Sequence, residues 1–371
     1  MKQLFEKSSQ GTLFSSEIII PETYQLQSKT SIISASDNNR RVLSGLKKGQ
    51  KNYFEGTWGT AMAFYSWLKK QVQQRYPATD YASSRIQREK LNEWTKHLFL
   101  PVKNHEPDLA KAPGNPWLKE FYPDKDHFYL RFTDYLGMNG ARQWYERGIR
   151  FPGLKHKVHP YYGTYFPTRT EHLEIFDEWL TKNHSFSSAV DMGAGCGALT
   201  FYLLKHGIKD ITATDINPNA LFSLQQDLKK IKSTSSVKPV QASLFDGLDT
   251  KNIDLLVFNP PWLPMESHTN IDKATYYNPG FFEAFFESAH KNIPTQATMV
   301  LIFSDFAIAA GLTPEHPIET ELQQNQRFEL VERTSKSLQQ KPSSGKNWLA
   351  TIRSKEKIEL WVLKSLKKPH A

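Results

Sequence analysis

The feature that most constrains the fold is a glycine-rich turn between a short apolar run and a helix-like run. Residues 189–192 read Ala-Val-Asp-Met, and glycine follows at the alternate positions Gly193, Gly195 and Gly197. Residues 198–204 then have the apolar pattern of a helix. Alternating glycines at a strand-to-helix turn let a ligand approach the backbone closely. The G-x-G-x-G spacing differs from the G-x-G-x-x-G of dinucleotide sites, so it favours a nucleoside without a pyrophosphate.

A second apolar run, residues 211–215, ends in an acid, Asp215. We expect this run to be the second strand of a doubly wound unit, where an acid at the strand end accepts both ribose hydroxyls. The alternative is that Asp215 caps the helix opened by Pro218, because Asp is a preferred N-cap residue. Asp191 has two interpretations as well: it organises the glycine loop and the bound nucleoside, or it is a strand-end acid that only caps the loop.

A third motif, Asn259-Pro260-Pro261-Trp262, directly follows the apolar run 254–258. Proline fixes φ and removes a backbone donor, so a strand cannot continue through two prolines. The turn leaves the Asn259 side-chain oxygen and the Pro260 carbonyl as free acceptors. We expect both to face a planar NH2 group, with the Trp262 ring over its flat face. This arrangement suits methyl transfer to an amide or exocyclic amine nitrogen, and the alternative for Trp262 is simple core packing.

Taken in order, the three motifs resemble those of the class I S-adenosylmethionine-dependent methyltransferases, over roughly residues 160 to 310. The segment from Asp191 to Gly197 is similar to their glycine-rich first motif, and the segment that begins at Thr214 is similar to their ribose-binding motif. The NPPW run is similar to the (N/D)PP(Y/F/W) signature of the amino-group branch. The resemblance implies S-adenosyl-L-methionine as the methyl donor. It also assigns residues to the donor site: Asp191, Gly193, Gly195, Gly197, Asp215, Ile216 and Asn259.

Two branches of this family are similar to the chain. Release-factor glutamine methyltransferases carry Pro-Arg-Pro-Glu-Thr-Glu before the first motif, and residues 166–171, Phe-Pro-Thr-Arg-Thr-Glu, are similar. The resemblance implies donor-side roles for Thr168 and Arg169, although Arg169 is equally well interpreted as a surface cation or a substrate contact. The small-domain ribosomal RNA guanine-N2 methyltransferases are similar in the first, second and NPP motifs.

The adenine contact departs from the family pattern. Glutamine methyltransferases carry Asp-Leu-Phe-Glu where this chain has Ser243-Leu244-Phe245-Asp246. The acid that meets the adenine amino group in the family therefore falls on Ser243. Either Asp246 or the Leu244 backbone is expected to substitute for it.

The order of predicted elements indicates two domains. Residues 151–371 alternate strands and helices, which favours a mostly parallel sheet with helices on both faces. The resemblance implies that this sheet is Rossmann-like and has seven strands. The resemblance implies that the last strands form an antiparallel end. Residues 1–150 are expected to form a mainly helical domain, with 1–40, which are polar and Ser-rich, partly disordered. Within it we expect helices over 57–75, 83–98 (with Ser84 as N-cap) and 128–149, and a loop over 101–123. A short hairpin is expected over 155–165.

Charge is unevenly distributed. Residues 1–150 contain 23 Lys and Arg against 15 Asp and Glu, a net charge of +8, of a total of +9 for the chain. Such asymmetry suggests a polyanionic partner. The alternative is a solvated basic surface with no partner. Net charge affects solubility and the attraction of charged partners, but it does not indicate a fold.

Several classes of protein are disfavoured. One cysteine, Cys196, rules out an internal disulfide and is typical of a reducing compartment. No run approaches the roughly 20 apolar residues of a membrane span, and the N-terminus lacks a signal-peptide core. The 12 histidines show no ligand spacing such as H-E-x-x-H, so we expect no metal. We therefore expect a cytoplasmic protein without a membrane partner.

The sequence predicts an enzyme that methylates an amide or exocyclic amino nitrogen of a macromolecule. Asn259, Pro260 and Trp262 are the catalytic candidates, and Pro261, Tyr276 and Tyr277 the substrate contacts, with loop packing as the alternative for the two tyrosines. The basic N-terminal part places an RNA or DNA base first as acceptor, and protein glutamine second. A small-molecule amine and a non-catalytic donor-binding module are further alternatives. Neither the oligomeric state nor the identity of the acceptor follows from the sequence.

Overall fold

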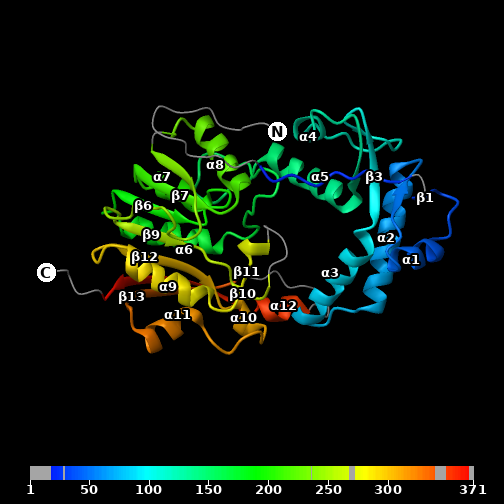
Figure 1. The fold of residues 1–371 in the computed structure, drawn as a ribbon. Coiled ribbons are helices and arrows are strands. Elements are labelled where there is room, and N and C mark those ends of the chain that lie inside the picture. Colours follow the sequence, from blue (N-terminus) through cyan, green and yellow to red (C-terminus); the bar gives the residue numbers. More distant parts are fainter. Residues whose placement is uncertain (1–17, 28–29, 235, 267–271, 339–347, 367–371) are drawn as a thin grey trace. The chain divides into compact units, whose positions relative to one another are not determined.

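The computed structural model describes residues 18–27, 30–234, 236–266, 272–338 and 348–366 (Figure 1). The described chain forms two compact units. One comprises residues 20–143, and the other comprises residues 18–19 together with 144–366. Each unit is described separately below.

A seven-stranded sheet forms the centre of the C-terminal unit. Its strand order is β13-β14-β12-β9-β6-β7-β8. β14 is antiparallel to both of its neighbours, and all other neighbouring pairs are parallel. The predicted mostly parallel seven-stranded sheet and its antiparallel end are thus confirmed. The strands span Ser188–Met192 (β6), Asp210–Asp215 (β7), Val237–Gln241 (β8), Leu255–Phe258 (β9), Thr298–Ser304 (β12), Phe328–Ser337 (β13) and Lys357–Ser365 (β14).

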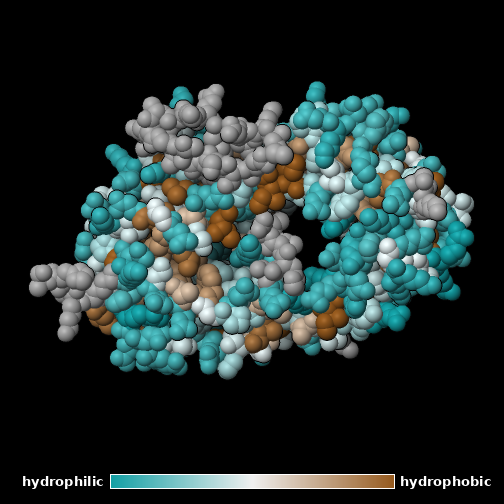
Figure 2. All heavy atoms as spheres, viewed as in Figure 1, coloured by the Kyte–Doolittle hydropathy of each residue, from teal (hydrophilic) through white to brown (hydrophobic). Residues whose placement is uncertain are grey.

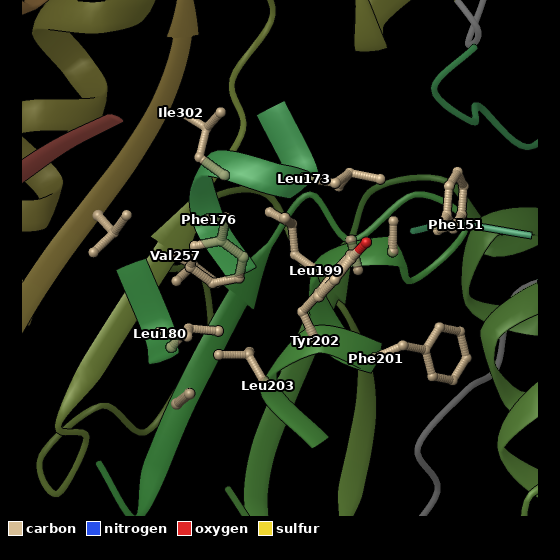
Figure 3. Close-up of a cluster of buried hydrophobic side chains, with 14 of the residues drawn as sticks. Phe151, Leu173, Phe176, Leu180, Leu199, Phe201, Tyr202, Leu203, Val257 and Ile302 are labelled. Carbon is tan, nitrogen blue, oxygen red and sulfur yellow. The ribbon is translucent and has the colours of Figure 1, made fainter. Parts of the chain in front are cut away.

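Helices cover both faces of this sheet. α6 (Glu171–Lys182), α7 (Ala198–Lys205) and α8 (Pro218–Lys230) pack on one face, and α9 (Phe281–Asn292) and α11 (Pro317–Thr320) on the other. Because side chains alternate along a strand, Val257 points to the first group of helices and Leu256 to the second. Figure 3 shows the first contact, in which side chains of α6 and α7 meet the sheet: Leu173, Phe176, Leu180, Leu199, Leu203, Val257 and Ile302.

Smaller elements complete this unit beside the sheet. They are β10 (Leu263–Pro264), β11 (Tyr276–Tyr277), α10 (Phe306–Ala309), α12 (Trp348–Arg353), a 3-10 helix at Asp272–Ala274 and a π-helix at Glu321–Asn325. β10 pairs in parallel with β11, which ties the chain after the NPPW turn to the segment before α9.

The three glycines between β6 and α7 have left-handed backbone conformations. Their φ angles are 64° at Gly193, 52° at Gly195 and 83° at Gly197. A Cβ atom at Gly197 would lie 2.5 Å from Leu224 Cδ1 of α8, and one at Gly195 would lie 3.3 Å from the backbone oxygen of Tyr165. Glycine is therefore needed both for the turn itself and for the close approach of its neighbours.

The helix after β7 begins differently from the alternative considered above. Asn217, not Asp215, is the N-cap of α8, and its side chain accepts a hydrogen bond from the backbone N–H of Asn219. Pro218 occupies the first turn, where its missing N–H costs nothing. The Asp215 carboxylate is thus available for another role.

The predicted hairpin over 155–165 is wrong. In its place Val158 forms an isolated bridge with Ile149, and the segment is held by a buried acid on α8. Asp227 accepts hydrogen bonds from the backbone N–H of His159 at 2.6 Å and from its Nδ1 at 2.8 Å. Hydrogen bonds to Asp227 of α8 therefore hold this segment in place of the predicted strand pairing.

Helices account for more of the N-terminal unit than strands do, in agreement with the predicted helical character. They are α1 (Asn39–Lys47), α2 (Trp58–Arg75), α3 (Tyr81–Thr95), α4 (Trp117–Phe121) and α5 (Phe132–Arg147). α3 begins earlier than expected, because Asp80 rather than Ser84 is its N-cap. On the face in Figure 2, the surface of this unit carries mostly hydrophilic side chains.

The N-terminal unit also contains a five-stranded sheet that was not predicted. It consists of β1 (Ser31–Ile33), β2 (Asn52–Phe54), β3 (Leu98–Lys103), β4 (Glu106–Pro107) and β5 (His127–Arg131). β3 and β5 fall in ranges assigned to a loop and a helix, and Pro101 within β3 opposes Tyr129 of β5. Proline disfavours a strand locally. The strand forms nevertheless, because β3 pairs with the distant segment β5.

The two remaining predictions for this part of the chain concern partial disorder of residues 1–40 and the domain boundary after residue 150. Of residues 1–40, residues 1–17 lie outside the described residues, whereas β1 and the start of α1 fall within the rest. The two units meet within α5, before the expected boundary after residue 150. Near this point, Trp144 packs on Phe166 and Tyr145 on Tyr161, with ring centroids 5.4 Å and 5.6 Å apart, so the end of α5 belongs to the C-terminal unit.

Candidate active site

A cavity of about 440 Å³ lies at the carboxyl ends of β6, β7, β8 and β9, the edge where open α/β sheets bind ligands. Residues from all three sequence motifs line it. The predicted site residues on its wall are Gly193, Gly195, Asp215, Ile216, Ser243, Leu244, Asn259, Pro261, Tyr276 and Tyr277. One cavity thus brings the glycine loop, the ribose-type acid and the NPPW turn together.

Backbone N–H groups hold the Asp215 carboxylate at the end of β7. Gly195 N donates to Oδ2 and Asn217 N donates to Oδ1, each at 2.8 Å. Burial raises the pKa of this acid. Each carboxylate oxygen keeps a further lone pair, so the carboxylate can also accept hydroxyl groups from a ligand in the cavity.

Ile216, the next residue, is 45% exposed although it is a large apolar side chain. It lines the cavity beside Asp215. Leu244 lines the cavity too, in a left-handed conformation with φ 49°. Two apolar side chains next to an acid suit a flat, apolar ring attached to a ribose, so the wall fits a nucleoside.

Asp191 and Gly197 lie behind the glycine loop rather than on the cavity wall. Asp191 is fully buried, and the Thr200 hydroxyl donates to its Oδ2 at 2.5 Å, while no described residue hydrogen-bonds its Oδ1. Burial raises the pKa of Asp191 to about 7. Gly197 is the N-cap of α7. These positions suit support of the loop from below and not direct contact with a ligand.

The two candidates for the adenine contact occupy different positions. Ser243 is exposed on the cavity wall, whereas Asp246 does not line the cavity. The backbone N–H of Asp246 donates to the Ser243 carbonyl at 3.0 Å, which closes a tight turn after β8. Of the two side chains, Ser243 is the one able to meet a ligand in this cavity.

The NPPW turn differs from expectation in two ways. The Asn259 oxygen is not free of partners, because Trp262 Nε1 donates to Oδ1 at 3.0 Å. The indole also does not line the cavity but packs against the apolar clusters on both faces of the sheet. Backbone hydrogen bonds beside the β10–β11 pair explain why the indole faces the apolar core. Trp262 N and Leu263 N both donate to the Thr275 carbonyl, at 3.2 Å and 3.0 Å.

Pro260 is buried below the wall, and no described residue donates to its carbonyl. Thr168 is exposed and Arg169 half-buried, and neither lines the cavity, although their neighbour Pro167 does. Arg169 Nη1 is buried without a partner among the described residues. The expected donor-side roles of Thr168 and Arg169 are therefore not supported by contact with the cavity.

Other wall residues were missed in the sequence. The cavity wall also includes Phe258, Phe281, His172 and the exposed Lys273. Burial lowers the pKa of His172 to about 4 and raises that of Tyr277 to about 12. His172 was detectable as a polar residue that falls on the apolar face of α6, whereas nothing in the sequence marked Lys273. Cys196 also lines the cavity, and burial raises the pKa of its thiol to about 12, which disfavours a nucleophilic thiolate.

The described residues contain no group of three His, Cys, Asp or Glu side chains placed to bind a metal ion. Within the same residues, no helix is both long and apolar enough to cross a membrane.

Comparison with known families identifies the segment that carries this site. Residues 174–312 match the family described as methyltransferase small domain. This match confirms the predicted resemblance to methyltransferases.

Curated relatives match over the same part of the chain. A candidate protein N5-glutamine methyltransferase of Methanocaldococcus jannaschii is 30% identical over 133 residues, 36% of this chain and 62% of the relative. The ribosomal protein uL3 glutamine methyltransferase of Francisella tularensis is 26% identical, over 28% of this chain and 33% of the relative. The release factor glutamine methyltransferase of Rhodopirellula baltica is 29% identical, over 28% and 36%. The chain therefore spans less than two thirds of the length of each of these relatives.

Solved structures with a similar arrangement include the ribosomal protein L11 methylase of Lactobacillus delbrueckii subsp. bulgaricus. It has a TM-score of 0.38 and 16% identity, covering 59% of this chain and 92% of its own. A tRNA m1G37 methyltransferase of M. jannaschii has a TM-score of 0.37 and 20% identity, covering 59% and 56%.

Proposed function

We propose that this chain, whose residues 174–312 match the methyltransferase small domain, is an S-adenosylmethionine-dependent enzyme that methylates an amide or exocyclic amino nitrogen. One observation carries the proposal. The nucleoside-type wall made by Gly195, Asp215 and Ile216 and the NPPW-type wall made by Asn259 and Pro261 belong to the same cavity. A methyl donor and its acceptor would therefore meet there.

The residues of the donor wall fit S-adenosylmethionine, which supplies a methyl group on a sulfonium sulfur that leaves as a neutral thioether. We assign Asp215 to the ribose hydroxyls, because its carboxylate is held in place by two backbone N–H groups. Ile216 and Leu244 flank the adenine ring, and Ser243 faces its edge. The backbone of Gly193 and Gly195 lies next to the rest of the donor.

The acceptor wall explains why no strong base is needed to activate the nitrogen for attack. The lone pair of an amide or aryl amine is delocalised, which makes it a poor nucleophile. Asn259 Oδ1 would accept one N–H bond through its second lone pair and turn the lone pair of the nitrogen toward the methyl group. The Pro260 carbonyl accepts no hydrogen bond from a described residue, and we propose it as the partner of the second N–H although Pro260 itself does not line the cavity. Such positioning contributes several kcal/mol, and preorganised acceptors add electrostatic support.

Trp262 supports this wall as a positioning residue. Its indole N–H donates to Asn259 Oδ1 at 3.0 Å and so determines which end of the amide group is the oxygen. Its ring is held by the apolar clusters on both faces of the sheet. This replaces the expectation that the indole lies on the flat face of the acceptor.

For the acceptor we place a protein glutamine side chain first. The three relatives named above are glutamine methyltransferases by name, and residues 166–171 are similar to the release-factor type. A nucleic-acid base comes second, and the net charge of +8 over residues 1–150 favours it. We propose that the N-terminal unit, residues 20–143, is a separate domain that recognises the acceptor, and that the C-terminal unit is the methyltransferase domain. A single cysteine and macromolecular acceptors of either kind suit a reducing compartment such as the cytoplasm.

The test is transfer of label from tritiated S-adenosylmethionine to a lysate of cells that lack this protein, divided into nuclease-treated and protease-treated halves. Label that survives nuclease but not protease supports a protein acceptor, and mass spectrometry then locates the methylated residue. Label that survives protease but not nuclease supports a nucleic-acid base and overturns the order given above. Wild-type protein that neither binds S-adenosylhomocysteine nor labels either half refutes the proposed function.

A further inference from the structure

His172 is a buried polar side chain without a partner. It is the second residue of α6, it is 3% exposed, and it is one of the residues that line the cavity. No described residue forms a hydrogen bond with either ring nitrogen. Neither nitrogen is among the fully enclosed side-chain atoms without a partner, so both stay open to a partner from outside the described residues. A ligand in the cavity can supply that partner.

His172 lies near the NPPW turn. Its ring centroid is 6.0 Å from that of Trp262, with the two ring planes at 85°. The same indole donates to Asn259 Oδ1. One tryptophan thus touches both the residue that holds the acceptor nitrogen and the imidazole, so His172 belongs to the acceptor wall.

The imidazole is uncharged near neutral pH. Burial is the main reason that its pKa is lowered to about 4, and Glu174 on the same helix opposes the shift only in part. The charge of Glu174 is engaged elsewhere, since Lys336 of β13 donates to it at 2.7 Å. A neutral imidazole has one nitrogen with a free lone pair. His172 can therefore accept a proton from the cavity.

Methyl transfer to nitrogen releases one proton that must leave a buried site. The lone pair of the acceptor nitrogen forms the new N–CH3 bond, while the S–CH3 bond of the donor breaks and its electron pair stays on sulfur. The nitrogen is then positively charged, and because its lone pair was conjugated it has become a strong acid. Even a weak base accepts that proton readily, provided that the base lies within hydrogen-bonding distance of the nitrogen.

We propose that His172 is a catalytic residue that accepts this proton on its free ring nitrogen. The imidazolium formed then loses the proton to water when the cavity opens to solvent, which restores the neutral ring. The proposal rests on the proposed function, because it needs a nitrogen acceptor next to Asn259. It assigns to the acceptor wall a base that neither the NPPW motif nor the family match supplies.

The competing explanation is that His172 only packs its ring against Trp262. Two variants separate these roles. His172→Phe keeps an aromatic ring of similar shape and removes both nitrogens. His172→Ala leaves a space that an added azole of imidazole size can fill. Neither variant changes the donor wall, so the affinity for S-adenosylhomocysteine, measured by calorimetry, should stay within about twofold of wild type.

The experiment uses the full chain, tritiated S-adenosylmethionine and the lysate fraction that wild-type protein labels. We expect His172→Phe to lower kcat by about 100-fold or more, the usual contribution of a positioned acid or base. Added imidazole should restore activity to His172→Ala, and 4-methylimidazole, a stronger base, should restore more. Pyrrole, which has the same shape but no basic nitrogen, should restore far less activity than imidazole.

Two results would overturn the role of His172 while leaving the proposed function intact. One is His172→Phe activity within a few fold of wild type. The other is equal rescue of His172→Ala by pyrrole and imidazole, which would mean that the ring only fills space. Wild-type protein that binds S-adenosylhomocysteine but labels no lysate fraction would instead remove the proposed function, and the role of His172 with it.

Discussion

On the donor side of the cavity, the groups that face the ligand come from the turns that directly follow β6, β7 and β8. On the acceptor side they come from separated segments: His172 of α6, the turn after β9, and residues 273–281. The donor side is built by local backbone geometry, with left-handed glycines and backbone N–H groups donating to Asp215. The acceptor side is built by side chains, with Trp262 joining Asn259 and His172. We therefore expect donor binding and turnover to be separable by substitution.

The largest effect is expected for Asn259→Ala. Loss of one preorganised group that stabilises the transition state typically costs 10²–10³ in rate, so kcat should fall about 100- to 1000-fold. The affinity for S-adenosylhomocysteine by calorimetry should remain close to wild type. Asn252→Ala is the matched control, because Asn252 is an exposed asparagine of the same unit that does not line the cavity. A loss of donor affinity as large as the loss of kcat in Asn259→Ala would contradict the separation of donor binding from turnover.

The converse change is Asp215→Asn on the donor side. Hydrogen bonds to a charged group contribute about 1.5–3 kcal/mol each, so the affinity for S-adenosylhomocysteine should fall about 10- to 100-fold. At saturating donor, kcat should change little. Asp210→Asn, at the exposed beginning of β7, should bind like wild type. Unchanged affinity in Asp215→Asn would remove Asp215 from the ribose site.

A smaller effect is expected for Trp262→Phe, which keeps a ring in the apolar clusters and removes the N–H that orients Asn259. One hydrogen bond contributes about 1 kcal/mol, so kcat should fall roughly 5- to 10-fold. KM for the acceptor should stay nearly constant, because the indole does not line the cavity. A rise in KM with constant kcat would instead support stacking on the acceptor. Trp144→Phe, at an exposed tryptophan away from the cavity, is the control.

The smallest expected effect concerns the support beneath the glycine loop. Burial raises the pKa of Asp191 to about 7, above the value of about 3.9 expected in an unfolded chain. The folded chain then holds the proton more tightly, so this group's contribution to stability is full below about pH 4 and is lost as the pH rises through about 7. The Tm of Asp191→Asn should accordingly decline less than that of wild type between about pH 5 and about pH 8.

Asp254 provides a control of opposite sign for this pH dependence. Hydrogen bonds from Ser187, chiefly from its side chain, lower the pKa of Asp254. Its contribution is therefore present above the unfolded pKa of about 3.9 and lost as the pH falls through its lowered folded pKa. Asp254→Asn should lower the Tm near neutral pH and leave the slope between about pH 5 and about pH 8 unchanged. A slope for Asp191→Asn equal to that of wild type would show that Asp191 stays charged in the folded chain.

Much of the donor side could be predicted from the sequence. Glycines at 193, 195 and 197 and an acid at 215 lie within short segments, and positive φ angles and strand ends are determined locally. The mostly parallel sheet followed from the alternation of short apolar runs and helical segments, whereas its seven strands were implied by the resemblance to methyltransferases. Even here the sequence did not show that Asp191 and Gly197 lie behind the loop rather than on the cavity wall, because whether a loop residue faces the cavity or the core depends on what packs beneath it.

The acceptor side and the N-terminal sheet could not be predicted in the same way. The NPPW motif indicated a turn and its acceptors, but the inward direction of Trp262 depends on hydrogen bonds to Thr275, across a gap in the described chain. The sheet in residues 20–143 pairs β3 with β5 across the intervening helix α4, and its strands carried proline where local rules disfavour a strand. Such contacts form only between segments that are distant in the chain.

The sequence by itself determined that a glycine-rich turn and an NPP turn follow strands of one sheet, because glycine and proline constrain the backbone wherever they occur. Only the tertiary structure decided that Trp262 donates to Asn259, that Ser243 rather than Asp246 lines the cavity, and that His172 lines it too, beside Trp262. The physical reason is that burial and side-chain hydrogen bonds depend on neighbours brought together by folding, which no local pattern specifies.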